Sequence, residues 1–412
     1  MRFARSLWLE GACLTVALMF PEKPATAQLS QNWTWCVNQN VSADLAISGC
    51  TAVIRSGKES PKNLARAFHN RANAYSDKGD KDRAIADYNE AIRLDPKDAR
   101  AFNNRGTAYS DKGDNDRAIA DYNETIRLDP KYARAFNNRG NAYGAKGDID
   151  RAIADYNEAI RLDPKYATAF HNRGNAYGAK GDNDRAIADY NEAIRLDPKF
   201  AMAFNNRGTA YSDKGDNDRA IADYNEAIRL DPKDATAFNN RGNVYDHKGD
   251  NDRAIADYNE AIRLDPKFPT AFNNRGRLFF RNGDFLKAAA DLLRANDLKP
   301  DAYAMLWRYL ALGHMGQGGA AELSANATRL KTKDWPYAVI DLYFGRRSLD
   351  EMRKAASNAD EKCESAFYAG EWELLRRHKA EAKASLQVAA DTCPKTSVEH
   401  GGAISELKRL SQ

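Results

Sequence analysis

The sequence predicts an all-α fold: a solenoid of stacked antiparallel helix hairpins, followed by a helical C-terminal region. Prolines recur every 34 residues, and the segments 133–166 and 167–200 differ at only four positions. Within each interval, apolar and small residues appear twice at helical spacing. A period of this length is typical of proteins in which each hairpin buries its apolar face against its neighbours. The periodic prolines are Pro96, Pro130, Pro164, Pro198, Pro232, Pro266 and Pro300.

The unit at residues 99–132 shows why one interval forms two helices. The first helix is marked by Ala101, Phe102, Gly106 and Tyr109. The second helix is marked by Ala118, Tyr122, Thr125 and Ile126. Between them, Gly113 ends one helix and Asp114 is suited to cap the next, because glycine tolerates a left-handed turn and aspartate accepts from free backbone amides. Asp129-Pro130 ends the second helix, since proline cannot continue it.

This order of an aromatic residue, a glycine, a tyrosine, an alanine, a second aromatic residue and a proline resembles the tetratricopeptide repeat (TPR). The resemblance covers seven units at residues 65–302, with Ala72 at the glycine position of the first unit. It implies a right-handed superhelix whose first helices line a concave, protein-binding groove. It also implies a helical cap at each end, which we place at residues 28–64 and 303–412, with a degenerate TPR at 363–396.

An arginine stands just before the small residue of every unit, where TPR sequences usually have leucine. Its aliphatic stem can pack while its guanidinium pairs with a carboxylate. Asp87 and Glu90, with their equivalents, are both candidates for that partner, and the sequence does not choose between them. The arginines are Arg71, Arg105, Arg139, Arg173, Arg207, Arg241 and Arg275.

The first 27 residues are typical of an export signal. Arg2 and Arg5 precede the apolar run 11–20, and the small residues of Ala25-Thr26-Ala27 offer a cleavage site. The apolar run is too short to span a bilayer, and no later segment is apolar enough to do so. We therefore expect a periplasmic or secreted protein without a transmembrane segment.

Four cysteines remain after such cleavage, and an even number in an exported chain predicts disulfides. Cys36 and Cys50 lie on two short helical stretches separated by a turn, and Cys363 and Cys393 lie at one end of a later hairpin. These positions predict the pairs Cys36–Cys50 and Cys363–Cys393. Zinc is the rival interpretation, but the usual CxxC spacing and paired histidines are missing from the sequence.

Three stretches of the C-terminal region resemble NlpI-type periplasmic TPR adaptors. They are LWRYLALG from Leu306, WPYAVIDLYFG from Trp335, and the hairpin around Gly370 followed by Val398-Glu399-His400. The resemblance implies a bacterial envelope protein that presents partners to one another, such as a processing protease and cell-wall hydrolases.

A ladder of asparagines on the first helices is the candidate peptide-binding site. A carboxamide both donates and accepts, so one per hairpin suits the backbone of an extended peptide. Arg66, Arg100 and Arg134 occupy equivalent positions in the first three units and would make that end of the groove more polar. Duplication without selection for binding is the alternative explanation of the ladder. Its members are Asn70, Asn104, Asn138, Asn172, Asn206, Asn240 and Asn274.

Other functional classes find little support in the sequence. The 62 basic and 58 acidic residues are closely mixed, which gives no clustered charge for nucleic acid. The six histidines are scattered, and no nucleophile or metalloprotease motif is present, so we predict no enzyme, no metal and no cofactor. A protein-binding scaffold is the favoured function. A glycan- or cell-wall-fragment-binding protein is the alternative, because the groove is rich in asparagine and tyrosine.

Overall fold

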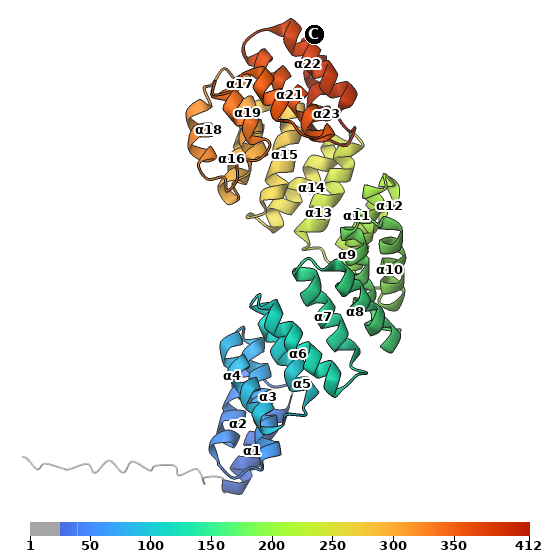
Figure 1. Cartoon of the computed structure of the whole chain (residues 1–412), viewed down its shortest axis with the longest axis vertical. Helices are drawn as coiled ribbons and strands as arrows, with labels where there is room; N and C mark the ends of the chain where they lie inside the picture. The colour runs from blue at the N-terminus through green and yellow to red at the C-terminus, as the bar shows by residue number, and fades with distance from the viewer. Residues whose placement is uncertain (1–24, 39) are drawn as a thin grey trace, which may run out of the picture. The chain divides into compact units, whose positions relative to one another are not determined.

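The computed structural model describes residues 25–38 and 40–412, with side chains from residue 30 onward, apart from residue 39. Residues 1–24 of the predicted signal peptide lie outside this range. Within it the chain forms α-helices and no strand, which confirms the predicted all-helical solenoid class. Figure 1 shows the helices in chain order. They fall into two compact units, with the division in the sequence between Pro164 and Lys165.

The N-terminal unit is a stack of four antiparallel helix pairs. The first pair precedes the periodic units and the next three correspond to units one to three. The helices are α1 (Ala25–Val37), α2 (Ala43–Arg55), α3 (Pro61–Asp77), α4 (Lys81–Leu94), α5 (Ala99–Asp111), α6 (Asn115–Leu128), α7 (Ala133–Ala145) and α8 (Ile149–Leu162).

The second unit begins with four more periodic pairs. They are α9 (Ala167–Ala179), α10 (Asn183–Leu196), α11 (Ala201–Asp213), α12 (Asn217–Leu230), α13 (Ala235–His247), α14 (Asn251–Leu264), α15 (Pro269–Arg281) and α16 (Phe285–Leu298). The remaining helices are less regular in length. They are α17 (Ala302–His314), α18 (Ala320–Ala327), α19 (Tyr337–Tyr343), α20 (Leu349–Ala355), α21 (Ala359–Leu375), α22 (Lys379–Thr392) and α23 (Val398–Leu410).

Turn and packing residues of each periodic hairpin act as the sequence predicts. Gly113 has φ 80°, a left-handed conformation that glycine adopts without steric cost. The side chain of Asp114 accepts from the backbone amide of Arg117 and caps α6. A Cβ added at Gly106 would lie 2.8 Å from Cε1 of Tyr122, so the close approach of α5 and α6 requires glycine there. The ring of Tyr122 fills the space between the two helices.

The recurring arginine pairs with the aspartate and not with the glutamate. Arg139 donates from Nε and Nη2 to the two carboxylate oxygens of Asp155, at 2.8 and 2.7 Å, within its own hairpin. Its Nη1 donates at 2.6 Å to Oδ1 of Asn123 on the preceding hairpin. The glutamate candidate pairs with a surface arginine of its own helix, as Glu158 does with Arg161. Each such arginine therefore joins the two helices of its own hairpin, and within each compact unit it also joins consecutive hairpins, as Arg105, Arg139, Arg207, Arg241 and Arg275 do.

The cysteines form the two predicted pairs. Cys36 in the last turn of α1 is bonded to Cys50 in α2, and Cys363 in α21 is bonded to Cys393, which follows α22. Each disulfide ties together the two helices of one pair. Disulfides of this kind persist in oxidising, exported compartments. No helix in the described part of the chain has the length and hydropathy needed to cross a membrane.

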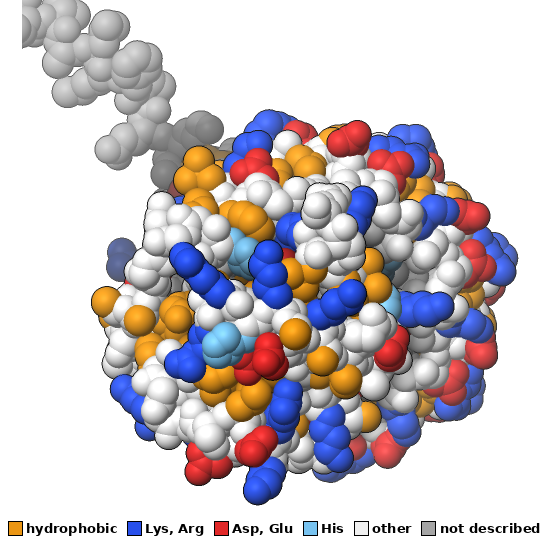
Figure 2. Space-filling view, turned by 90° about the horizontal axis from the view of Figure 1, so that it is seen from above, with side chains coloured by type: hydrophobic (Ala, Val, Ile, Leu, Met, Phe, Trp, Pro, Cys, Tyr) orange, Lys and Arg blue, Asp and Glu red, His pale blue; other side chains and the backbone are white. Residues whose placement is uncertain are grey.

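The C-terminal helices share one large hydrophobic core. Trp307 on α17 is fully buried and packs against Phe280 at 4.9 Å and Phe367 at 5.1 Å between ring centroids. Tyr343 on α19 joins the same core and donates to the backbone carbonyl of Tyr368. A capping box opens α20, where Ser348 and Glu351 exchange hydrogen bonds. Basic, acidic and apolar side chains are interspersed over the face seen in Figure 2.

Candidate functional site: a polar cleft in the N-terminal unit

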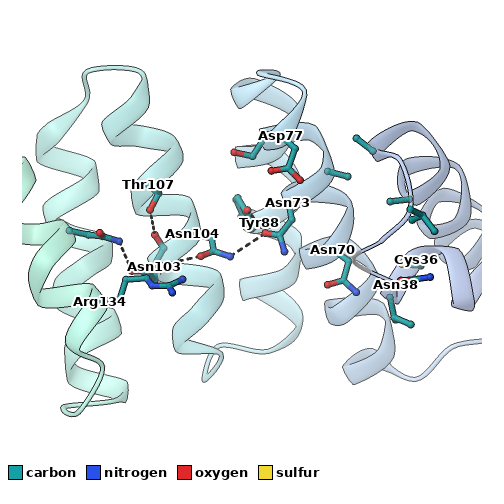
Figure 3. Close-up of a pocket in the computed structure, with 17 residues that line it drawn as sticks. Cys36, Asn38, Asn70, Asn73, Asp77, Tyr88, Asn103, Asn104, Thr107 and Arg134 are labelled. Carbon is teal, nitrogen blue, oxygen red and sulfur yellow. Dashed lines mark hydrogen bonds between the residues drawn. The ribbon is translucent and has the colours of Figure 1, made fainter. Parts of the chain in front are cut away.

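A cleft of about 580 Å³ lies in the N-terminal unit, between the α1–α2 pair and the first helices of units one to three (Figure 3). Its apolar end is formed by the initial pair, through side chains such as Val37, Val41 and Ala46. The rest of its wall comes from α3, α5 and α7, which place carboxamides along the cleft because each hairpin repeats the same register. The amides lining it are Asn38, Asn70, Asn73, Asn103, Asn104 and Asn138.

Several of these amides are hydrogen-bonded to one another across consecutive hairpins. Asn104 donates from Nδ2 to Oδ1 of Asn73 at 3.1 Å, and Asn138 donates to Oδ1 of Asn103 at 3.2 Å. Asn103 in turn donates to Oδ1 of Asn104 at 3.1 Å. Tyr88 completes the network by donating its hydroxyl to Oδ1 of Asn73 at 2.6 Å. Some donors and acceptors of the ladder are therefore used in hydrogen bonds within the protein, and these bonds fix the orientations of the amides.

Four polar groups on the cleft wall are available to bind a ligand through hydrogen bonds or ion pairs. Asn70 makes no side-chain hydrogen bond with the described residues, and Nδ2 of Asn73 donates to none of them. Arg134, exposed on α7, and Asp77, exposed at the end of α3, form no ion pair within the described chain. The cleft thus offers one unpaired cation and one unpaired anion at separate places, with free amide groups besides. This combination suits a polar, extended ligand that carries both charges.

Burial and charge reinforce the network beside the cleft. The pKa of Tyr88 is raised, first by burial of its hydroxyl and then by the negative charge of Asp77, so the phenol stays protonated and donates. Nδ1 of His69 on α3 lies 3.5 Å from Oδ2 of Asp98, the residue that caps α5. Burial alone would raise the pKa of the Asp98 carboxyl, but His69 and Arg100 lower it to about 2. The carboxylate of Asp98 therefore stays ionised at neutral pH.

The structure brings only some of the predicted groove residues into this cleft. Asn70, Asn104 and Asn138 line it, as does Arg134. Arg66 and Arg100 are exposed but do not line it, and Arg100 instead contacts Asp98 at 3.4 Å.

The ladder continues in the second unit with the same internal bonding. Asn206 donates to Asn175 at 2.9 Å, Asn240 donates to Asn205 at 3.2 Å, and Asn274 donates to Asn239 at 3.1 Å. Asn172 lies 3.3 Å from the imidazole of its neighbour His171. These amides keep the orientation found in the N-terminal unit.

Sequence reasoning missed Asn73 and Asn103, which stand beside the ladder in the network. A signal was present for Asn103, because an asparagine immediately precedes the ladder residue in most units, whereas Asn73 lies three residues after the ladder residue Asn70. On a helix, adjacent residues point about 100° apart, so only one of the two was expected to face the groove. The close packing of consecutive first helices brings both within hydrogen-bond distance.

A second titratable cluster lies in the C-terminal core. Nε2 of His314 is 3.0 Å from Glu371 and 3.6 Å from Glu406, and the ligand atoms of all three lie within 4.8 Å of one another. These residue types are able to hold a divalent cation. Arg409, however, already forms an ion pair with Glu406. Its guanidinium supplies positive charge to the two buried carboxylates. We therefore interpret the cluster as a buried network of ion pairs and not as a metal site.

Two family models match the chain in overlapping stretches. One, described as a TPR repeat, matches residues 72–113, 106–147, 140–181 and 174–215, and the other, described as a tetratricopeptide repeat, matches 205–269 and 239–303. Together they span residues 72–303, which is more than half of the 412 residues. No curated protein matches the sequence.

Several solved structures are similar to this chain. A tetratricopeptide repeat protein from Parabacteroides merdae is 21% identical with a TM-score of 0.50, and the match covers 60% of this chain and 98% of that one. MamA is 30% identical with a TM-score of 0.36, covering 40% and 96%. YrrB, a TPR protein with an unusual peptide-binding site, is 24% identical with a TM-score of 0.37, covering 45% and 95%. The first of these supports the fold.

Proposed function

Because this chain belongs to the tetratricopeptide-repeat proteins, whose repeats serve as protein–protein interaction scaffolds, we propose that its N-terminal cleft holds an extended segment of a partner protein. The proposal rests on the polar groups of the cleft wall that lack a hydrogen-bond or ion-pair partner among the described residues. They are Asn70, Nδ2 of Asn73, Arg134 and Asp77. An acidic residue of the segment pairs with Arg134 and a basic residue pairs with Asp77. The free amides bind its backbone.

The internal amide network supports this function through preorganisation. The bonds of Asn104 and Tyr88 to Asn73 fix the carboxamide of Asn73 with its Nδ2 donors free. A binding wall that is already ordered loses less entropy when a ligand binds. The cleft volume of about 580 Å³ lies in the range of about 300–1,000 Å³ that is common for ligand sites.

Peptide selection on the purified chain tests the proposal. A displayed library of random linear peptides is enriched on the protein, and the affinities of the selected peptides are measured by fluorescence anisotropy. Replacing Arg134 by alanine removes a charge-assisted hydrogen bond, worth about 1.5–3 kcal/mol, so binding should weaken by about tenfold or more. Arg66→Ala is the matched control, because Arg66 is an exposed arginine of the first repeat outside the cleft.

Two outcomes would contradict the proposal. One is equal loss of affinity in the Arg134→Ala and Arg66→Ala proteins. The other is a failure to enrich any peptide while cell-wall saccharide fragments raise the unfolding temperature, which would favour the glycan-binding alternative.

We further propose that the protein works in an oxidising compartment outside the cytoplasm, the periplasm or the exterior. The two disulfides support this location, since such bonds are rare in reducing compartments. The resemblance of the C-terminal stretches to NlpI-type adaptors makes an envelope protease or a cell-wall hydrolase the first partner to test. Crosslinking in intact cells with a photoreactive residue at Asn70 would identify the protein held in the cleft.

A further inference from the structure

A second pocket lies in the C-terminal region, far along the sequence from the N-terminal cleft. It has a volume of about 520 Å³ and is formed by the turn that leads into α17 and by the segment before α19. Its inner wall contains three aromatic side chains, Tyr303, Trp335 and Tyr337, together with Leu298 and Leu330. Large aromatic surfaces with polar handles are typical of sites that anchor another protein.

A half-buried carboxylate holds two of these aromatic side chains in place. Oε2 of Glu364 on α21 accepts from the hydroxyl of Tyr303 at 3.0 Å and from the indole Nε1 of Trp335 at 2.7 Å. The pKa of Glu364 is raised, chiefly because burial disfavours its charge, and the two donors oppose that rise. The two hydrogen bonds of Glu364 therefore fix the positions of Tyr303 and Trp335 in the pocket wall.

The rim of the pocket is locally basic. Lys299, Arg329 and Lys331 are exposed on it, against one exposed acid, Asp334. The two lysines form no ion pair with the described residues, and Arg329 only donates to neutral oxygens of Asn296 and Asn326. The other acid that lines the pocket, Asp301, caps α17 by accepting from the backbone amide of Ala304. None of the three cations on the rim therefore forms an ion pair with the described residues.

From the aromatic wall and the basic rim together, we propose that this pocket binds an acidic segment of a partner protein that inserts one large apolar side chain. The apolar side chain packs on Trp335 and Tyr303, and flanking Asp or Glu side chains pair with Lys299 and Lys331. Complementary charge accelerates and orients such an encounter, while the buried apolar anchor supplies most of the affinity. The site is separate from the N-terminal cleft and adds a second docking point to the scaffold.

Synthetic peptides test this site directly. The probe is an amidated, fluorescein-labelled peptide with one central phenylalanine flanked by aspartates, and its binding to the full chain is followed by anisotropy. Matched peptides replace the aspartates by serine, replace the phenylalanine by alanine, or end in a free carboxylate. The parent peptide should bind at least tenfold more tightly than the first two, and amidation should make no difference.

Variants locate the binding on the proposed surface. Charge reversal in Lys299→Glu/Lys331→Glu should weaken the parent peptide by about tenfold or more, whereas the exposed control Lys383→Glu should change it little. Glu364→Gln keeps an oxygen acceptor for both aromatic donors and should retain binding, while Glu364→Leu should lose it. Circular dichroism of each variant verifies that the helices remain folded. Arg134→Ala in the N-terminal cleft should leave the affinity unchanged, which separates this test from that of the proposed function.

Three results would overturn the inference. The first is no saturable binding of the parent peptide up to millimolar concentration. The second is binding that the Lys299→Glu/Lys331→Glu protein retains in full. The third is binding that requires the free carboxylate, which would assign the pocket to the end of a chain and not to an internal acidic segment.

Discussion

The periodic hairpins and the C-terminal helices are both entirely helical, but different interactions hold them together. A periodic hairpin packs on the next one through a small core, such as that of Ala118 and Tyr122 with Ala142 of the following hairpin, and it also contains a partly buried arginine–aspartate pair. The C-terminal helices share one extended core around Trp307 and Phe367. Stability of the hairpins is therefore local and nearly additive, whereas the C-terminal helices should unfold as one cooperative unit.

The largest expected effect comes from the centre of the C-terminal core. Trp307→Ala should lower the free energy of unfolding of this region by about 4 kcal/mol, because a fully buried ring leaves a cavity that packed neighbours cannot fill. Trp372→Ala is the control, since Trp372 is only half-buried and lies against Arg376. Urea titration followed by near-ultraviolet circular dichroism measures both. Similar losses in the two variants would show that the C-terminal core is not one cooperative unit.

Removal of a disulfide should cost about 3 kcal/mol in the chain-entropy model, with different consequences in the two regions. The Cys36→Ser/Cys50→Ser variant should unfold the α1–α2 pair, whose core consists of few residues besides the cysteines. The Cys363→Ser/Cys393→Ser variant should leave the C-terminal helices folded, because their shared core remains. Limited proteolysis with mass spectrometry distinguishes the two cases. Cleavage within α21 and α22 at the same rate as within α1 and α2 would refute the contrast.

Loss of one arginine should destabilise the array by a smaller amount, about 2 kcal/mol, and only nearby. Arg139→Ala leaves the buried carboxylate of Asp155 without its counterion and removes the bond to Asn123 on the preceding hairpin. Arg161→Ala is the control, because its pair with Glu158 is exposed and worth less than about 1 kcal/mol. Hydrogen exchange should increase in α6, α7 and α8 and not in the C-terminal helices. A uniform increase along the chain would contradict local, additive stability.

The smallest effect concerns alkaline pH. Burial raises the pKa of Tyr122 and of Tyr224 to about 12, above the value of about 10 in an unfolded chain. Because the folded-state pKa is the higher one, this contribution to stability is complete below pH 10 and is lost between about pH 10 and 12. Tyr122→Phe should therefore reduce the loss of helicity in that range, whereas Tyr132→Phe, at a half-exposed position, should not. Circular dichroism during a base titration provides the measurement.

The regular part of this fold was predictable because its signals are local. The period of the prolines, the turn at Gly113-Asp114 and the close contact of Gly106 with Tyr122 all depend on residues near in sequence. The partner of Arg105 was not predictable, since Asp121 and Glu124 lie one turn apart on the same helix. Only the packing shows that the aspartate is the buried one.

The candidate sites were predictable only in part. The ladder position of Asn104 follows from the repeat, but its bond to Asn73 depends on the distance between consecutive hairpins. The cluster of His314, Glu371 and Glu406 joins residues on three helices, α17, α21 and α23, that no periodicity relates. Likewise, nothing in the sequence near Trp335 indicates that its indole meets Glu364.

The bond from each arginine to the preceding hairpin has an evolutionary consequence. Arg105 contacts Asn89, Arg241 contacts Asn225 and Arg275 contacts Asn259, always through the same atoms. Units one to six contain both the arginine and the asparagine, whereas the seventh unit has Leu293 at the asparagine position. A gene rearrangement that deletes or inserts whole 34-residue units inside the array would therefore rejoin matching surfaces. The number of repeats can therefore change without a compensating mutation. The length of the scaffold can change in one step, while the residues at each repeat position stay the same.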